Sequence, residues 1–209
     1  MEIYIFGSLV RGDIDNYSDV DILILKRKNE RLKDLNIQNY SIYNEERILQ
    51  IWEEGNPFAW HLFLESKCIF KTSELSFFEK IGEPKSYIGY LHDLEKFYNL
   101  YLESVSSLTH NNLCTDFDAS MIFLAVRNFA SCFSLGKLKV PIFSRDSALQ
   151  IEKFSLNIDI NIYNNLRKSR ILATRGIGQP LDVKETKEIA KVLPQIDQWF
   201  LNLINYAKG

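Results

Sequence analysis

Short apolar runs separated by polar turns fill the N-terminal third of the chain, a pattern that is typical of β-strands. The runs are rich in β-branched and aromatic residues. They span residues 2–6, 19–25, 37–43 and 67–71. From Glu45 to about residue 64, apolar residues instead recur at helical spacing, with a break at Gly55-Asn56-Pro57. This part therefore predicts a small unit that mixes strands and helices.

Beyond about residue 84 the pattern becomes helical. We expect helices over residues 86–105, 116–134, 159–175 and 182–206. The predicted N-caps are Ser86, Asp116 and Asp182, and the predicted C-terminal glycines are Gly136, Gly176 and Gly209. The sequence thus predicts an α+β protein with two domains. Residues 1–84 form a small α/β domain with a mixed sheet, and residues 85–209 form an all-α helical bundle.

Composition is that of an ordinary soluble globular protein, with 46% hydrophobic residues and a formal net charge of −2. This charge does not favour nucleic acid as a partner. The chain has three cysteines, far apart and without metal-ligand spacing, which predicts reduced thiols in a cytoplasmic protein. The apolar runs are too short to predict a membrane span. The three histidines have no partner at metal or triad spacing.

Two aspartates suggest a metal site. Asp19 and Asp21 are two residues apart in the predicted strand 19–25, so both side chains would project from one face while Val20 and Ile22 point into the core. Close carboxylates repel each other, and a divalent cation relieves the repulsion. Oxygen ligands of this kind suit magnesium. A pair of solvated acids on an edge strand is the alternative interpretation.

A glycine turn ends the first predicted strand. Gly7 allows close backbone approach, and Ser8 adds a hydroxyl and an amide that can hold phosphate oxygens. Arg11, followed by Gly12, adds a positive charge. An ordinary strand-ending turn would show the same residues.

Together these residues resemble a known signature. The stretch from Phe6 to Gly12, followed by Ser18-Asp19-Val20-Asp21-Ile22-Leu23-Ile24, is similar to the motif of the DNA polymerase beta-like nucleotidyltransferase superfamily. The nearest likeness is to minimal and kanamycin-type bacterial nucleotidyltransferases, which carry a C-terminal helical domain.

The resemblance implies a reaction as well as a fold. Asp19 and Asp21 would bind Mg²⁺, while Gly7, Ser8, Arg11 and Ser18 would bind a nucleoside triphosphate. An acceptor hydroxyl would attack the α-phosphorus and release pyrophosphate, with two metal ions stabilising the attacking and leaving oxygens. The resemblance also implies a homodimer.

One part of the family pattern is missing. Members usually carry a third carboxylate on a later strand, but residues 39–43 contain no acid. The candidates for its role are Glu45, Glu46, Glu65, Asp116 and Asp118. The last two are slightly preferred, and Asp118 joins Asp19 and Asp21 in the predicted catalytic set. Each candidate also has a plainer role, such as favouring a helix N-terminus.

Two functions stay open at this point. The first is a magnesium-dependent nucleotidyltransferase that moves a nucleoside monophosphate onto the hydroxyl of a small molecule or a protein. The second is a catalytically inactive nucleotide-binding or interaction module of the same fold, including a defence or toxin–antitoxin component.

Overall fold

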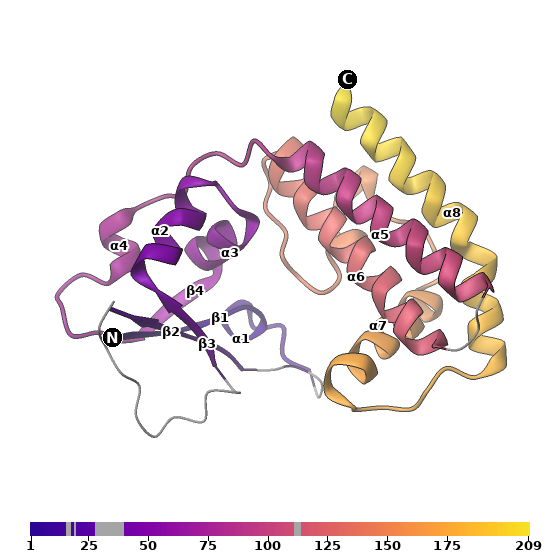
Figure 1. Ribbon diagram of the computed structural model, residues 1–209, viewed down its shortest axis with the longest axis horizontal. Coiled ribbons are helices and arrows are strands. Elements are labelled where there is room, and N and C mark those ends of the chain that lie inside the picture. The colour runs from indigo at the N-terminus through magenta and orange to yellow at the C-terminus, as the bar shows by residue number, and fades with distance from the viewer. Residues whose placement is uncertain (16–17, 19, 28–39, 111–113) are drawn as a thin grey trace. The chain divides into compact units, whose positions relative to one another are not determined.

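The computed structural model describes residues 1–15, 18, 20–27, 40–110 and 114–209. The chain divides into two compact units, Met1–Ile88 and Gly89–Gly209 (Figure 1). The first unit holds a four-stranded mixed sheet and the second is helical, so the predicted α+β fold class is confirmed.

The first unit is built on one sheet. Its elements are β1 (Glu2–Phe6), α1 (Ser8–Arg11), β2 (Asp21–Lys26), β3 (Ser41–Asn44), α2 (Glu45–Glu53), α3 (Pro57–Glu65), β4 (Ser66–Phe70) and α4 (Phe77–Ile81). The strand order is β3-β2-β1-β4. Strand β1 pairs antiparallel with both β2 and β4, whereas β2 and β3 run parallel. Strand β1 therefore lies between β2, which begins at Asp21 of the predicted motif, and β4.

Strand β2 begins later than the sequence predicts. Its first residue is Asp21, which pairs with Phe6, the last residue of β1. Asp19 lies outside the described residues. The prediction that Val20 points into the core is wrong, because Val20 lies outside the strand and is 56% exposed. With β1 ending at Phe6, no further strand residue is available to pair with Val20.

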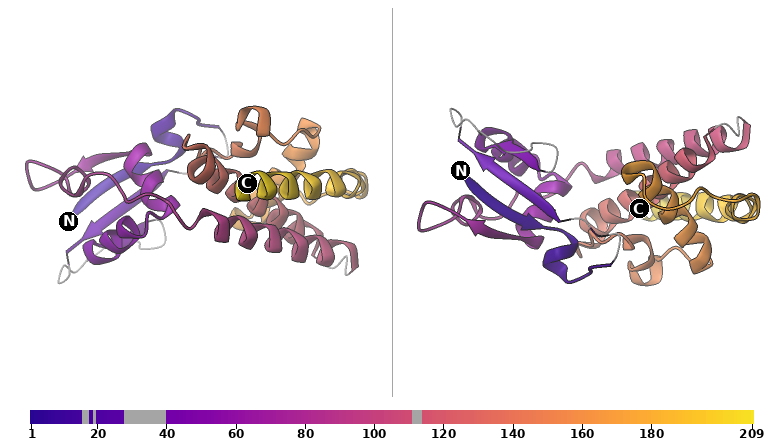
Figure 2. Two further views of the ribbon diagram at one scale, coloured as in Figure 1. Left: turned by 90° about the horizontal axis from the view of Figure 1, so that it is seen from above. Right: turned by 90° about the horizontal axis from the view of Figure 1, so that it is seen from below.

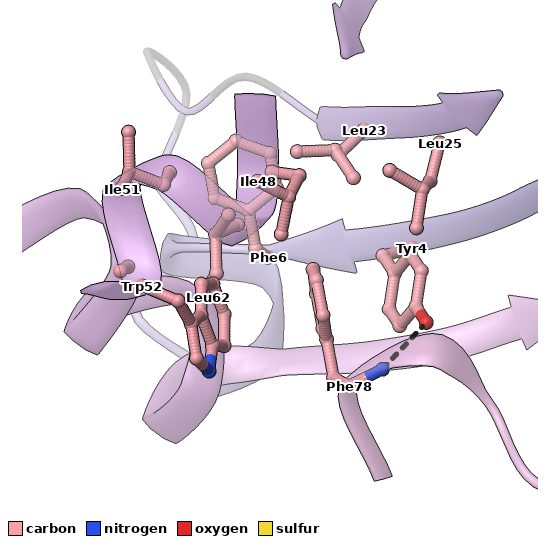
Figure 3. Packing of buried hydrophobic residues seen from close by; sticks show 10 residues of the cluster. Tyr4, Phe6, Leu23, Leu25, Ile48, Ile51, Trp52, Leu62 and Phe78 are labelled. Carbon is pink, nitrogen blue, oxygen red and sulfur yellow. Dashed lines mark hydrogen bonds between the residues drawn. The ribbon is translucent and has the colours of Figure 1, made fainter. Parts of the chain in front are cut away.

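The core of this unit lies on one face of the sheet. Leu23 and Leu25 alternate with Asp21 on that face and are almost fully buried under the helices. Figure 3 shows them beside Tyr4, Phe6 and side chains of α2, α3 and α4. Asp21 thus projects from the helix-covered face at its edge, and not from the opposite face that the sequence analysis favours.

Local capping explains the two helices that cover the sheet. Asn44 caps α2 by accepting a hydrogen bond from the Arg47 amide at 2.7 Å, and Asn56 caps α3 by accepting from the Phe58 amide at 2.8 Å. Pro57 occupies the first turn of α3, where the missing N–H costs nothing. The predicted break between the two helices is confirmed.

The second unit consists of long helices. They are α5 (Tyr90–His110), α6 (Thr115–Phe133), α7 (Ile160–Arg175) and α8 (Val183–Lys208), with a π-helical turn at Ser134–Leu138. Two short 3₁₀ turns lie at Ser147–Leu149 and Glu152–Phe154. Helix α6 packs against α5 and α7, while α8 runs beside α5 (Figure 2). Buried aromatic rings join them, as where Phe129 and Phe200 meet edge to face at 4.6 Å between centroids.

Some predicted helix ends are correct and others are wrong. Asp182 caps α8 through a capping box, and Gly176 ends α7 in the left-handed conformation, as predicted. Helix α5 begins at Tyr90 and not after Ser86, and Cys114 rather than Asp116 occupies the N-cap of α6. Gly136 lies inside the π-helical turn instead of ending the helix.

Helix α6 is the central helix of this unit. Together with the π-helical turn it forms a stretch of 24 residues, Thr115–Leu138, whose most apolar window of 18 residues has a mean hydropathy of 1.3. That is longer than the apolar runs predicted from the sequence, and by length and composition alone it could cross a membrane. Because 78% of its most apolar window is buried, packing in the protein core accounts for its composition.

Gly136 should tolerate no side chain. A Cβ there would lie 2.3 Å from the Cβ of Tyr90, so backbone must shift. We expect Gly136→Ala to lower the unfolding free energy by about 1–3 kcal/mol through overpacking. Gly89→Ala is the matched control, because a Cβ at Gly89 would meet nothing within 4 Å. Equal urea-denaturation midpoints for the two variants would contradict this packing.

Candidate functional site

The Gly7 turn and Asp21 lie against each other. The pairing of Phe6 with Asp21 places Gly7, the next residue, beside the aspartate. A Cβ on Gly7 would lie 2.7 Å from Oδ2 of Asp21, closer than such atoms approach. Gly7 also has φ 72° and ψ −140°, a conformation that residues with a side chain rarely adopt. Glycine is therefore required here for two independent reasons, and the carboxylate lies directly against the turn.

A very short helix follows the turn. Helix α1 spans only Ser8–Arg11, and the Gly7 carbonyl accepts hydrogen bonds from Val10 and Arg11, each at 3.1 Å. The first residues of a helix have N–H groups that find no acceptor within the helix itself. The amides of Ser8 and Leu9 are in this position, directly after Gly7. Groups of this kind suit phosphate oxygens.

Glu65 borders the turn on the side of β4. Its backbone carbonyl accepts a hydrogen bond from the Gly7 amide at 3.3 Å. Its carboxylate accepts one from Arg11 and lies 3.0 Å from Nε2 of His61. The three side chains are between 15% and 20% exposed. His61 is a residue that the sequence analysis missed, although its spacing of four residues from Glu65 on a helix could have indicated the contact.

Electrostatics keep Glu65 ionised. Burial is the largest influence and by itself would raise the pKa of this carboxyl. The close contacts with His61 and Arg11 outweigh burial and lower the pKa of the Glu65 carboxyl below its ordinary value. The same logic applies to Arg11, where burial lowers the pKa but hydrogen bonds to Asp13 and Glu65 raise it above its ordinary value. Both partners thus carry full charge at neutral pH.

Other predicted binding residues have partners within the protein. The Arg11 guanidinium contacts Asp13 at 3.0 Å as well as Glu65. The Ser18 hydroxyl accepts from the Asp15 amide and donates to the Asp15 carboxylate, both at 2.9 Å. The nucleotide-binding roles of Arg11 and Ser18 stay predictions.

Two candidates for the third acid lie at the wrong end of the sheet. Asn44, the last residue of β3, pairs with Lys26, and Glu45 and Glu46 follow it. Lys26 lies at the other end of β2 from Asp21, five residues on. A strand rises about 3.3 Å per residue, so this end is roughly 16 Å from Asp21. Glu45 and Glu46 are therefore too far away to share a site with Asp21.

The two candidates of the helical unit hold their own unit together. Asp116 accepts hydrogen bonds from the Leu181 amide at 3.0 Å and from the Ser169 hydroxyl at 3.4 Å. Asp118 is 5% exposed and accepts from the Ser107 hydroxyl at 3.1 Å. These contacts tie α5, α7 and the segment just before α8 to α6. A catalytic role for Asp118 stays a prediction.

The comparison with protein families now identifies the first unit. Residues 1–75 match the family described as Polymerase beta, Nucleotidyltransferase. This region is a nucleotidyltransferase domain of the DNA polymerase beta superfamily. The match contains all four strands, the Gly7 turn and Asp21, so it confirms the resemblance and supports a general nucleotidyltransferase function. No curated protein matches the chain.

The oxygen donor at the turn suits a divalent cation. Domains of this family typically use one. Among the residues that the structure describes, no three His, Cys, Asp or Glu side chains form a metal-binding group. Magnesium, however, commonly takes only one or two carboxylates and completes its shell with water and phosphate oxygens. The Asp21 carboxylate is a ligand of this type, and it lies beside a turn that suits phosphate.

Gly7 offers a direct test of this geometry. Gly7→Ala and Gly12→Ala both place a Cβ on a residue with positive φ. At Gly12, which is in the left-handed helical region, this costs on the order of 1–2 kcal/mol, whereas φ 72° with ψ −140° at Gly7 is a conformation that suits glycine almost alone. Only the first also pushes against Asp21, since a Cβ at Gly12 would meet nothing within 4 Å. We expect Gly7→Ala to weaken magnesium-dependent triphosphate binding by about tenfold or more, as a loss of 1.4 kcal/mol would. Equal affinities of the two variants for the magnesium–triphosphate complex, measured by calorimetry, would contradict the close contact between residue 7 and Asp21.

The lowered pKa of Glu65 predicts a pH-dependent stability. The folded-state pKa lies below the ordinary value of 4.5, so the ionised carboxylate stabilises the fold above that pH. This stabilisation is lost as the pH falls from 4.5 through the folded-state pKa. Urea unfolding should show wild type more stable than Glu65→Gln at pH 7, with the difference shrinking below pH 4.5. A difference that stays constant down to pH 3 would count against the ion pair.

Proposed function

We propose that the protein is a magnesium-dependent nucleotidyltransferase that moves a nucleoside monophosphate from a nucleoside triphosphate to an acceptor hydroxyl. The observation that carries this proposal is the contact of Gly7 with the Asp21 carboxylate at the end of the paired strands. It joins a backbone turn suited to phosphate with an oxygen ligand suited to magnesium.

Each part of the site has a defined task in this reaction. The backbone amides that follow Gly7, with the Ser8 hydroxyl, bind the terminal phosphates. Asp21, together with Asp19, would hold magnesium, which would neutralise phosphate charge and so favour departure of pyrophosphate. The acceptor oxygen forms a bond to the α-phosphorus, the bond from that phosphorus to the pyrophosphate oxygen breaks, and the hydroxyl proton passes to a base. The acceptor hydroxyl belongs to a small molecule or to a protein side chain.

The positions of the acids favour a second candidate, an inactive module that binds nucleotide without transferring it. The described strand β3 carries no acid, and Glu45 and Glu46 follow its far end. Glu65 is engaged by Arg11 and His61. A domain without a carboxylate near the acceptor would retain phosphate and metal binding while losing the base.

Nucleotide binding tests what the two candidates share. Asp21→Asn keeps the side-chain volume and removes the charge, so the fold should survive. We expect calorimetry with magnesium and a non-hydrolysable ATP analogue to show affinity weakened by about tenfold or more, because a charged metal ligand is lost. Asp19→Asn should act in the same direction. Glu46→Gln, on the exposed surface of α2, is the matched control and should bind like wild type.

Transfer separates the two candidates. Wild-type protein is incubated with magnesium, an α-³²P-labelled nucleoside triphosphate and a panel of hydroxyl-bearing small molecules and proteins. An enzyme releases pyrophosphate and leaves the label on one acceptor, and Asp21→Asn abolishes both. Binding without label transfer to any acceptor of the panel would favour the inactive module. Unchanged binding by Asp21→Asn would contradict both.

A further inference from the structure

We propose that Glu65 is a positioning residue that holds the phosphate-binding turn in place at both of its ends. This inference rests on the proposed function, because it assigns Glu65 to the same triphosphate site. The Glu65 backbone carbonyl binds the Gly7 amide at the start of the turn, at 3.3 Å. The Glu65 carboxylate binds Arg11, the last residue of α1, at the other end.

The turn itself needs such support. Helix α1 has four residues, and all of them are only partly buried, so apolar packing holds it less firmly than it holds the longer helices of this unit. A single helical turn is also unstable by itself, since nucleation costs more than one hydrogen bond returns. The place of Ser8 and its neighbouring amides therefore depends on how the two ends of the segment are attached.

Glu65 is well suited to provide that attachment. It is the last residue of α3, and the next residue, Ser66, pairs with Phe6 in the sheet. The buried side chains of Ala59 and Leu62 fix α3 in the core. The backbone of Glu65 is thus held from both directions, by the helix before it and the strand after it.

His61 fixes the carboxylate in turn. Its Nε2 lies 3.0 Å from Oε2 of Glu65. The imidazole packs edge to face on Phe6 and Phe58, with ring centroids 5.6 Å and 6.4 Å away. Because the imidazole is packed, the Glu65 carboxylate has little freedom to turn away from Arg11. The same oxygen, Oε2, meets both His61 and Arg11.

This arrangement argues for positioning over a direct part in the reaction. The Glu65 charge is already matched by Arg11, and the pKa of its carboxyl lies below the ordinary value, which is poor for a group that must take a proton. Asp13 also contacts Arg11, at 3.0 Å, but is 60% exposed and so is a weaker anchor. Without the Glu65 carboxylate, the turn must be ordered when the phosphate binds, which lowers affinity.

The test compares Glu65→Gln, Arg11→Met, the double variant and, as control, Asp13→Asn. We expect each of the first two to weaken binding of magnesium and a non-hydrolysable ATP analogue by about tenfold, as the loss of a charge-assisted hydrogen bond would. The double variant should bind no more weakly than either single variant, because both remove one contact. Asp13→Asn should stay within about twofold, as befits an exposed pair. In Glu65→Gln the KM for the triphosphate should rise by more than kcat falls, because positioning of the turn acts first on binding.

Two results would overturn the proposal. One is normal triphosphate affinity in Glu65→Gln with loss of pyrophosphate release, which would make Glu65 a catalytic acid. The other is additive losses in the double variant. Hydrogen exchange gives a separate measure that needs no ligand: the amides of Val10, Arg11 and Gly12, which bond to Gly7 and Ser8, should exchange faster in Glu65→Gln.

These measurements separate the inference from the function on which it rests. If wild type itself does not bind the triphosphate, the proposed function is wrong. Hydrogen exchange does not depend on that result: if the amides of Val10, Arg11 and Gly12 exchange as slowly in Glu65→Gln as in wild type, Glu65 does not hold the turn in place.

Discussion

The antiparallel pairing of β1 with β2 is the constraint on which the site depends. It ends with Phe6 opposite Asp21, so the chain must turn at the residue where the carboxylate lies. Only glycine fits there, because a Cβ would meet Oδ2 of Asp21 and φ is positive. Shifting this register by one residue would turn Asp21 to the other face and remove Leu23 and Leu25 from the core. The burial of the core therefore also fixes the geometry of the site.

Strand β1 also joins two acidic residues with different surroundings. On one side, Asp21 lies against the Gly7 turn at the end of β2. On the other, Glu65 precedes β4 and is held by Arg11 and His61. The two carboxylates lie on either side of the same turn. Glu65 forms an ion pair with Arg11 and so stabilises the protein, whereas Asp21 lies against the turn itself. Such a division of roles follows from environment, since both groups have the same chemistry.

The sequence was sufficient for the elements that depend on local pattern. The strand before Gly7, the break at Pro57 and the capping of α8 by Asp182 all follow from neighbouring residues. The family of residues 1–75 follows from the spacing of the glycine, serine and aspartates in the motif.

The predictions that were wrong are those that depend on how the strands pair in the folded protein. Val20 is exposed because β1 ends at Phe6, which no pattern within 19–25 reveals. Glu45 is close to the third strand in sequence, but parallel pairing of β3 with β2 places it at the far end.

The central claim is that a metal-bound triphosphate binds between the Gly7 turn and Asp21, and NMR with a paramagnetic ion tests it most directly. Manganese replaces magnesium in complex with a non-hydrolysable ATP analogue, and each backbone amide signal is followed as the complex is added. We predict that the signals of Gly7, Ser8 and Asp21 broaden first, while those of Glu45 and Glu46, at the far end of the sheet, stay sharp. Broadening that begins at Glu45, or that leaves Gly7 and Asp21 untouched, would contradict it.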